Sequence, residues 1–235
     1  GFAFNPVLTL SQKKAYIDKA MDVADILGTK LIRIFSNLSD GSLGYKEFIT
    51  DPCLEYALEK ASQRDIYLLI ENEPVCAINK KMDVLKILKF FKDKRLKLWL
   101  DIANFYQQKE ILNLEEIKEF LPYTMYIHVK DFETTNGFKY VSMGKGLINY
   151  KRIFSDIKKT VLTSNYQFPY TSIETHVKEN KISATKESID YLRVINTQPR
   201  IGYALIGAGR VVRKHIEAFK LDNNSELRGV FDIDA

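Results

Sequence analysis

Hydrophobic and polar positions follow two alternating periods along most of the chain. After Ser11, the expected N-cap, apolar residues recur at helical spacing as far as Gly28, which predicts a helix. An apolar run at residues 30–35 then predicts a strand. The alternation repeats, with strand-like runs that end at residues 71, 101, 128 and 174 and helical stretches between them. This pattern predicts an α/β fold, a parallel sheet with helices outside it. Periodicity leaves open whether the sheet is open or closed into a barrel.

Three polar residues mark where further helices should begin. Asp51 precedes Pro52 at the first helical position, and Asn113 and Asn149 stand at the start of later amphipathic stretches. A last helix is expected from about residue 183 to residue 195. These boundaries place each strand-like run directly before a loop that leads into a helix.

Four side chains that bind metals each end an apolar, strand-like run: Glu71, Asp101, His128 and Glu174. A charged group is costly inside a core unless it is paired or coordinated. The carboxyl ends of parallel strands meet at one edge of the sheet, where ligands collect. One such residue alone is more often a helix cap or a surface charge, but four in register predict a shared cation. Three oxygens and one nitrogen suit Mn, Mg, Co or Zn and leave room for a substrate hydroxyl and carbonyl.

The segments around these ligands resemble, in order and spacing, the sugar phosphate isomerase/epimerase family, which has the xylose isomerase-like TIM barrel. The resemblance rests on Ile70-Glu71-Asn72, Leu100-Asp101-Ile102-Ala103-Asn104, Ile127-His128-Val129-Lys130-Asp131, Ser172-Ile173-Glu174 and the glycine loop Gly144-Lys145-Gly146-Leu147-Ile148-Asn149-Tyr150. It covers roughly residues 8–195. It implies a (β/α)8 TIM-barrel-like domain that lacks about two N-terminal βα units, which would leave strand edges exposed. The absence of an initiator Met before Gly1 likewise suggests a processed chain or a fragment.

The resemblance also implies a chemistry for this site. One divalent metal would be bound by Glu71, Asp101, His128 and Glu174. Glu71 and Glu174 would in addition be catalytic, because they would take and return a proton beside a ketose carbonyl through an enediolate. The substrate would be a small carbohydrate, either a sugar or a sugar phosphate.

Three further residues are candidates for substrate binding. Asn104 stands where many family members carry a histidine, and an amide can bond a hydroxyl but cannot move a proton. Lys130 shares a strand face with His128, so it either holds a phosphate or hydroxyl or extends from the rim into solvent. His176 shares a face with Glu174 and either contacts substrate or bonds water at the rim.

Three other residues near the expected site have structural interpretations. Arg33 could reach an anionic substrate, but a salt bridge between barrel layers is the favoured interpretation. Asp131 either orients a ligand or caps the following loop, and the cap is favoured. Trp99 is expected in the core.

The pattern changes after Pro199. Residues 200–206 predict a strand, Gly207-Ala208-Gly209 a tight turn, residues 210–219 a helix and residues 227–232 a second strand. We therefore expect two domains, 1–197 and 198–235. The second stretch resembles the opening of the glucose–fructose oxidoreductase (Gfo/Idh/MocA) dehydrogenases, which have a Rossmann fold. Gly207, Gly209 and Asp232 would contact NAD(P), but one strand–helix–strand unit holds the cofactor only as part of a full domain.

Composition narrows the classes of function. The 235 residues are 46% hydrophobic and 28% charged, which is typical of a globular protein. The net charge of +5 is scattered, without a basic stripe that would favour nucleic-acid binding. No apolar run approaches the ~18 residues that span a membrane, and two unpaired cysteines suit the cytoplasm. A homo-oligomer is compatible with the sequence.

Three functions from different classes remain. The first is a metal-dependent sugar or sugar phosphate isomerase or epimerase, fused to an NAD(P)-dependent dehydrogenase. The second is a dehydratase on the same barrel, acting on inosose- or shikimate-like compounds. The third is a non-catalytic scaffold barrel. The related DNA-repair endonucleases need more histidine ligands than the three histidines of this chain provide.

Overall fold

Six parallel strands form the main sheet, and they follow one another across it in chain order. They are β1 (Phe2–Ala3), β2 (Leu31–Phe35), β3 (Tyr67–Glu71), β4 (Leu96–Asp101), β5 (Thr124–Val129) and β8 (Tyr170–Ile173). Within the described residues, β1 and β8 do not pair with each other, so this sheet is open. The predicted α/β class is confirmed, and six parallel strands with their helices are consistent with part of a TIM barrel.

The structure, a computed structural model, describes residues 1–37, 45–135, 137–164, 166–167, 169–196, 201–206 and 225–231. The chain divides into two compact units, Gly1–Tyr191 and Leu192–Ala235. Each unit is described by itself.

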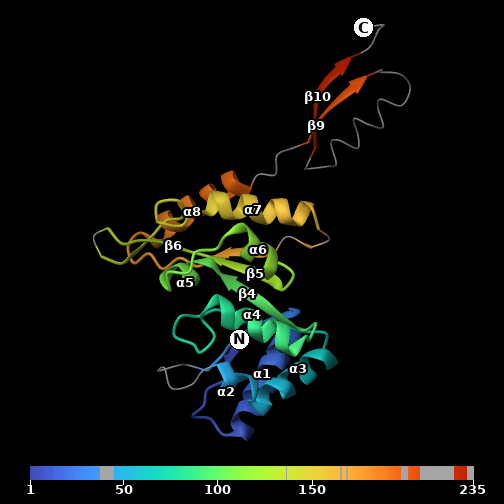
Figure 1. Cartoon of the computed structure of the whole chain (residues 1–235), viewed down its shortest axis with the longest axis vertical. Helices are drawn as coiled ribbons and strands as arrows, with labels where there is room; N and C mark the ends of the chain where they lie inside the picture. The colour runs from blue at the N-terminus through green and yellow to red at the C-terminus, as the bar shows by residue number, and fades with distance from the viewer. Residues whose placement is uncertain are drawn as a thin grey trace. The chain divides into compact units, whose positions relative to one another are not determined.

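Helices alternate with the strands in the first unit. They are α1 (Leu10–Leu27), α2 (Tyr45–Ile49), α3 (Pro52–Gln63), α4 (Lys81–Phe91), α5 (Ile102–Gln107), α6 (Leu114–Phe120), α7 (Tyr150–Leu162) and α8 (Lys181–Asn196), of which α8 continues into the second unit. Figure 1 shows them flanking the sheet in chain order, from α1 and α3 in blue to α6 and α7 in green and yellow. A short antiparallel hairpin, β6 (Asp131–Glu133) and β7 (Lys139–Val141), lies outside the main sheet.

The helix boundaries follow local capping chemistry. Asp51 accepts a hydrogen bond from the backbone N–H of Cys53 at 2.9 Å and caps α3 as predicted. Asn113 forms a capping box with Glu116 at the start of α6. The prediction for α1 was wrong by two residues. Its N-cap is Thr9, because Thr9 and Gln12 form the capping box there.

Strand alternation separates a buried core from the face that carries the site. Leu100 of β4 and Ile127 of β5 are buried and border the same small space as Ile117 of α6 and Ile153 of α7. Full burial of each such side chain contributes about 1.5–3 kcal/mol. The neighbouring positions on each strand point to the opposite face, away from these helices.

The second unit contains two parallel strands among its described residues. These are β9 (Ile201–Ile206) and β10 (Ser225–Phe231), with a shift in register between Leu227 and Gly229. The predicted cofactor residues Gly207, Gly209 and Asp232 and the predicted helix 210–219 lie outside the described residues. The domain boundary after residue 197 and NAD(P) binding therefore stay predictions.

No helix in the described part of the chain is long and apolar enough to cross a membrane.

Both cysteines are buried, and their thiols are expected to resist alkylation in the folded protein. Burial, followed by the charges of Glu73 and Glu71, raises the pKa of Cys76 to about 12, and burial and then Asp51 raise the pKa of Cys53. The thiolate is the reactive form, so at pH 8 iodoacetamide should modify Cys76 about three orders of magnitude more slowly than a free thiol. Mass spectrometry of the native and urea-unfolded protein checks this. Complete alkylation of the native chain within minutes would contradict it.

Candidate metal centre

Three of the predicted ligands converge at the carboxyl ends of neighbouring strands. Glu71 ends β3, Asp101 ends β4 and His128 lies near the end of β5, where Asp101 and His128 are direct partners in the parallel register. One potential ligand atom from each lies within 4.8 Å of the others. His128 Nδ1 is 2.8 Å from Glu71 Oε1 and 4.0 Å from Asp101 Oδ2. All three side chains are buried, so the cluster combines two carboxylates and an imidazole away from water.

Asp101 is the most tightly held member of this group. The Asn72 side chain forms two hydrogen bonds with the Asp101 backbone. Asn72 Nδ2 donates to the Asp101 carbonyl, and Asn72 Oδ1 accepts from the Asp101 N–H, each at 2.8 Å. Asp101 Oδ1 accepts the backbone N–H of Asn104 at 2.9 Å and thereby caps α5. Oδ2 lies 2.9 Å from Lys130 Nζ and forms an ion pair with that ammonium.

The charge of this buried oxygen tests the fit to a metal. Asp101 Oδ2 is paired with the Lys130 ammonium and faces His128 Nδ1 across 4.0 Å. A buried carboxylate needs a cation, either a side chain or a metal, to offset its charge. Carboxylate oxygens and an imidazole nitrogen are donors for Mn, Co or Zn, and carboxylates also suit Mg. The residues present therefore fit a divalent ion.

Glu174, the fourth predicted ligand, comes directly after β8. Its backbone N–H donates to the carbonyl of Val129 at 3.0 Å, which holds it beside the end of β5. Its Oε2 lies 2.8 Å from Lys130 Nζ, 3.1 Å from His176 Nε2 and 4.0 Å from His128 Nδ1. Glu174 thus reaches the edge of the cluster but is held by two cationic or polar neighbours, and its role as a ligand stays a prediction.

Lys130 is buried between two of these acids. It does not extend from the rim into solvent, which corrects that interpretation of the sequence, because Asp101 and Glu174 both hold its ammonium. Burial works to lower the pKa of Lys130, but the two acids outweigh it and raise the pKa. Burial works to raise the pKa of Glu174, but Lys130 and then His176 lower it to about 2. Both groups are therefore charged at neutral pH.

Arg33 of β2 makes the salt bridge that the sequence favoured, and its partner is Glu71, a predicted metal ligand. Its Nη1 lies 3.0 Å from Glu71 Oε2, on the other side of that carboxylate from His128. The guanidinium lies over the rings of Phe35 and Trp99, 4.8 and 5.4 Å from their centroids. Trp99 is only half-buried, which corrects the expectation that it belongs to the core.

Trp99 and Tyr126 form a stacked aromatic pair on the same face of the sheet. Their centroids are 3.9 Å apart with an interplanar angle of 24°, and the His128 ring meets Trp99 edge-on at 4.9 Å. The pair occupies neighbouring register positions on β4 and β5. It therefore supports the imidazole from the side opposite the strand ends.

The other two predicted substrate residues lie at different depths. Asn104 is buried, with its Nδ2 3.5 Å from Glu73 Oε2. His176 is exposed and stacks on Tyr140 at 4.7 Å, beside Glu174. Substrate contact by Asn104, Lys130 or His176 stays a prediction.

Sequence reasoning missed Glu73, which lies at the edge of the cluster. Burial raises its pKa, Lys130 lowers it, and Glu71, Asp101 and Glu174 raise it further. The spacing Glu71-Asn72-Glu73 was an available signal, because Glu73 comes two residues after the end of β3 and residues two apart in an extended chain share a face.

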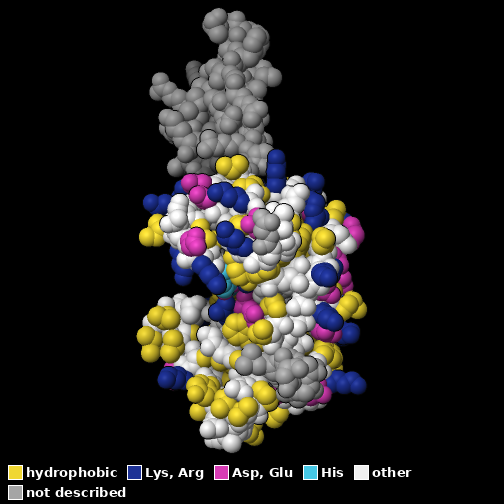
Figure 2. Space-filling view, turned by 90° about the vertical axis from the view of Figure 1, so that its left-hand side faces the viewer, with side chains coloured by type: hydrophobic (Ala, Val, Ile, Leu, Met, Phe, Trp, Pro, Cys, Tyr) yellow, Lys and Arg dark blue, Asp and Glu magenta, His cyan; other side chains and the backbone are white. Residues whose placement is uncertain are grey.

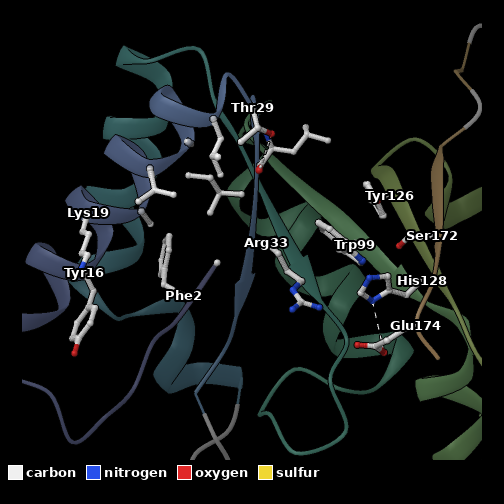
Figure 3. A pocket seen from close by; sticks show the side chains of 17 residues that line it. Phe2, Tyr16, Lys19, Thr29, Arg33, Trp99, Tyr126, His128, Ser172 and Glu174 are labelled. Atoms are coloured by element: carbon white, nitrogen blue, oxygen red, sulfur yellow. Dashed lines mark hydrogen bonds and ion pairs between the residues drawn. The ribbon is translucent and has the colours of Figure 1, made fainter. Parts of the chain in front are cut away.

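A cavity of about 730 Å³ opens onto this side of the sheet. Figure 3 shows Arg33, Trp99, His128 and Glu174 along one part of its wall, and Phe2 and Tyr16 along another. Figure 2 shows a recess in the surface at which a histidine and acidic side chains meet lysine or arginine side chains. A cavity of this size admits a sugar-sized ligand next to the cluster.

Asp131 organises the glycine loop beside the site. Its Oδ1 accepts backbone N–H groups of Phe132 and Ile148 at 3.0 and 3.3 Å, and its Oδ2 those of Gly144 and Gly146 at 3.0 and 3.1 Å. A Cβ on Gly146 would lie 2.2 Å from Asp131 Oδ1, so only glycine fits there. The cap interpretation of Asp131 is supported by these bonds.

Replacement of Asp131 by alanine is expected to destabilise the protein by at least about 3 kcal/mol, because four backbone donors lose one charged acceptor. Urea unfolding followed by circular dichroism measures this change. Glu179→Ala, which removes an exposed acid, is the control and should change stability by less than about 0.5 kcal/mol. Equal stability of the two variants would contradict the proposed role of Asp131.

Fold and site together define a parallel α/β protein with a cluster of potential metal ligands at the carboxyl ends of its strands. A family model described as a xylose isomerase-like TIM barrel matches residues 5–195. The chain therefore belongs to the xylose isomerase-like TIM barrel family, as the sequence resemblance predicted. No curated protein matched the sequence.

Three solved structures illustrate the likeness. The probable 3-DHS dehydratase AsbF from Bacillus anthracis, involved in petrobactin synthesis, has a TM-score of 0.68 at 15% identity, over 84% of this chain and 75% of that one. IOLI protein with a zinc atom has a TM-score of 0.66 at 16% identity, over 83% of this chain and 74% of that one. An L-ribulose 3-epimerase has a TM-score of 0.62 at 12% identity, over 79% of this chain and 67% of that one. At these identities the likeness shows the fold.

Proposed function

We propose that the chain belongs to a divalent-metal-dependent isomerase or epimerase of a sugar or sugar phosphate, which moves a proton beside a carbonyl through an enediolate. The observation that carries the proposal is the buried cluster of Glu71, Asp101 and His128, whose potential ligand atoms lie within 4.8 Å of one another. Family membership and the fold shared with L-ribulose 3-epimerase support the reaction class.

Glu71, Asp101, His128 and Glu174 would hold the ion, and the bound metal would polarise the substrate carbonyl. His128 contributes a nitrogen whose position is set by Trp99, and Asp101 is fixed by Asn72. Rigid placement of the ligands matters because a metal site tolerates little displacement.

Glu71 and Glu174 would carry the proton. They come from β3 and from the segment after β8, with β4 and β5 between them. Glu174 lines the cavity, and Glu71 is buried against Arg33 and His128, which also line it. Glu174 is ionised at neutral pH, as a general base must be before it accepts a proton. Lys130 would hold that carboxylate and a substrate hydroxyl, and Asn104 and His176 would contact further hydroxyls.

Solvent deuterium incorporation tests this proposal. Ketoses and ketose phosphates are incubated with the manganese-loaded protein in D₂O, and NMR detects deuterium at the carbon next to the carbonyl. Incorporation that disappears with EDTA and returns with manganese is the expected result. Loss of water with a new enone absorbance would indicate a dehydratase instead. Neither reaction in a protein that binds the metal would contradict the proposal and indicate a scaffold.

We also propose that residues 198–235 begin an NAD(P)-binding domain, so that the whole protein joins the isomerase to a dehydrogenase in the cytoplasm. The parallel pairing of β9 and β10 supports this arrangement. The reading frame beyond residue 235 tests it. We expect further strand–helix units of a dehydrogenase, and an immediate stop codon would contradict the proposal.

A further inference from the structure

Arg33 places a cation in the wall of the cavity that borders the metal centre. It lies on β2, and His128 and Glu174 line the same cavity from β5 and from the segment after β8. Figure 3 shows its guanidinium reaching from its strand toward the side of the cavity where these two residues lie. The side chain is about one-third exposed (34%), so a ligand in the cavity can reach it.

The guanidinium is held in place before any ligand arrives. Glu71 Oε2 fixes one of its nitrogens at 3.0 Å, and the rings of Phe35 and Trp99 lie against it. A guanidinium has five N–H donors in a planar fork. Among the described residues Glu71 is its only hydrogen-bond partner, so donors remain for a second acceptor. A group that is already ordered loses little entropy on binding.

A structural role as counter-ion to Glu71 does not explain this arginine well. Its permanent charge beside a carboxylate that would bind the metal repels a divalent ion, and it occupies Oε2, one of the two oxygens of that carboxylate. Glu71 already has a second partner in His128, at 2.8 Å. An arginine in this position becomes favourable when a negatively charged ligand enters the cavity.

We propose that Arg33 binds an anionic group of the substrate, a carboxylate or a phosphate, and thereby selects acidic sugars or sugar phosphates over neutral sugars. The inference rests on the proposed function, because it places this anion on the same molecule that the metal centre would act on. Two parallel N–H donors of a guanidinium match the two oxygens of either group.

Calorimetric titration of the manganese-loaded protein with inorganic phosphate and with malonate tests the inference. We expect Arg33→Gln to weaken binding of at least one anion by 10-fold or more. Arg33→Lys keeps the positive charge but loses the planar set of N–H donors, and we expect it to weaken binding of that anion about 3- to 10-fold. The anion that responds identifies the substrate group as phosphate or carboxylate. Lys19→Gln is the matched control, because Lys19 is an exposed cation of α1 that lines the same cavity, and it should change affinity less than 2-fold.

Manganese affinity is measured in the same variants and separates the two proposals. We expect Arg33→Gln to bind manganese as tightly as the wild type or more tightly, since a repelling charge is gone. If manganese binds but both anions bind Arg33→Gln as they bind the wild type, the anion site is refuted while the metal centre stands. If no variant binds manganese, the proposed function fails, and titration of the metal-free protein still measures the effect of Arg33. Should Arg33→Gln not fold, unchanged affinity of Arg33→Lys for both anions refutes the inference.

Discussion

Replacing Glu174 with glutamine is expected to lower the rate of proton exchange beside a ketose carbonyl by about 10²- to 10⁴-fold, the usual contribution of a general base. The amide has the size of the carboxylate and can still accept a hydrogen bond from Lys130, so the fold should be retained. It cannot take up the proton. The measurement is the rate of deuterium incorporation into the substrate at saturating manganese.

Glu179→Gln provides the control for this experiment. Glu179 is an exposed acid in the same segment and lies outside the metal centre. It should leave the exchange rate within about 2-fold of the wild type. An exchange rate for Glu174→Gln near that of the wild type, in protein that binds manganese, would exclude Glu174 as a proton carrier.

Replacing His128 with alanine is expected to weaken binding of manganese or zinc by at least about 100-fold. His128 supplies the only nitrogen of the cluster, and its Nδ1 faces both Glu71 and Asp101. Loss of a direct ligand removes both the bond and the geometry that the other ligands share. Calorimetric titration of metal-free protein measures the change.

His176→Ala is the matched control, because it also removes an imidazole near Glu174 but lies outside the buried cluster. It should change metal affinity by no more than about 5-fold. Circular dichroism checks that His128→Ala is folded, because removal of the His128 ring also removes its contact with Trp99. Equal losses of metal affinity in the two variants would contradict the assignment of His128 to the centre.

The strand ends could be predicted from the sequence because the apolar runs before them are continuous. The run before Glu71 is buried along most of its length, and those before Asp101 and His128 combine buried and half-buried positions, so the polar residue that follows each run marks the carboxyl end of a parallel strand. The parallel register then brings Asp101 and His128 together without further information. This is why three candidate ligands could be named before their geometry was known.

Long-range pairings could not be predicted in this way. The bond between Lys130 and Glu174 joins residues 44 positions apart, and the pair of Arg33 and Glu71 joins residues 38 apart. Such contacts depend on how neighbouring strands are staggered, which periodicity does not report. The same applies to Trp99, whose alternating position fits a core residue equally well as a cavity wall.

Short helices and strands also could not be predicted from the hydrophobic periodicity. The strand β1 has two residues, α2 has five, and the hairpin β6–β7 pairs three residues with three. A period needs about two turns or four strand positions before it differs from chance. Thr9 was missed as the cap of α1 because Ser11, two residues later, offers the same chemistry.

Titration of the metal-free protein with Co²⁺, followed by visible absorbance, tests whether Glu71, Asp101 and His128 form a metal centre. Cobalt bound by carboxylates and imidazole has ligand-field bands that depend on the donor set. We expect saturation at about one equivalent per chain, reversal by zinc, and loss of the bands in His128→Ala but not in His176→Ala. Absence of saturable cobalt binding, or an unchanged spectrum in His128→Ala, would contradict a metal centre formed by Glu71, Asp101 and His128.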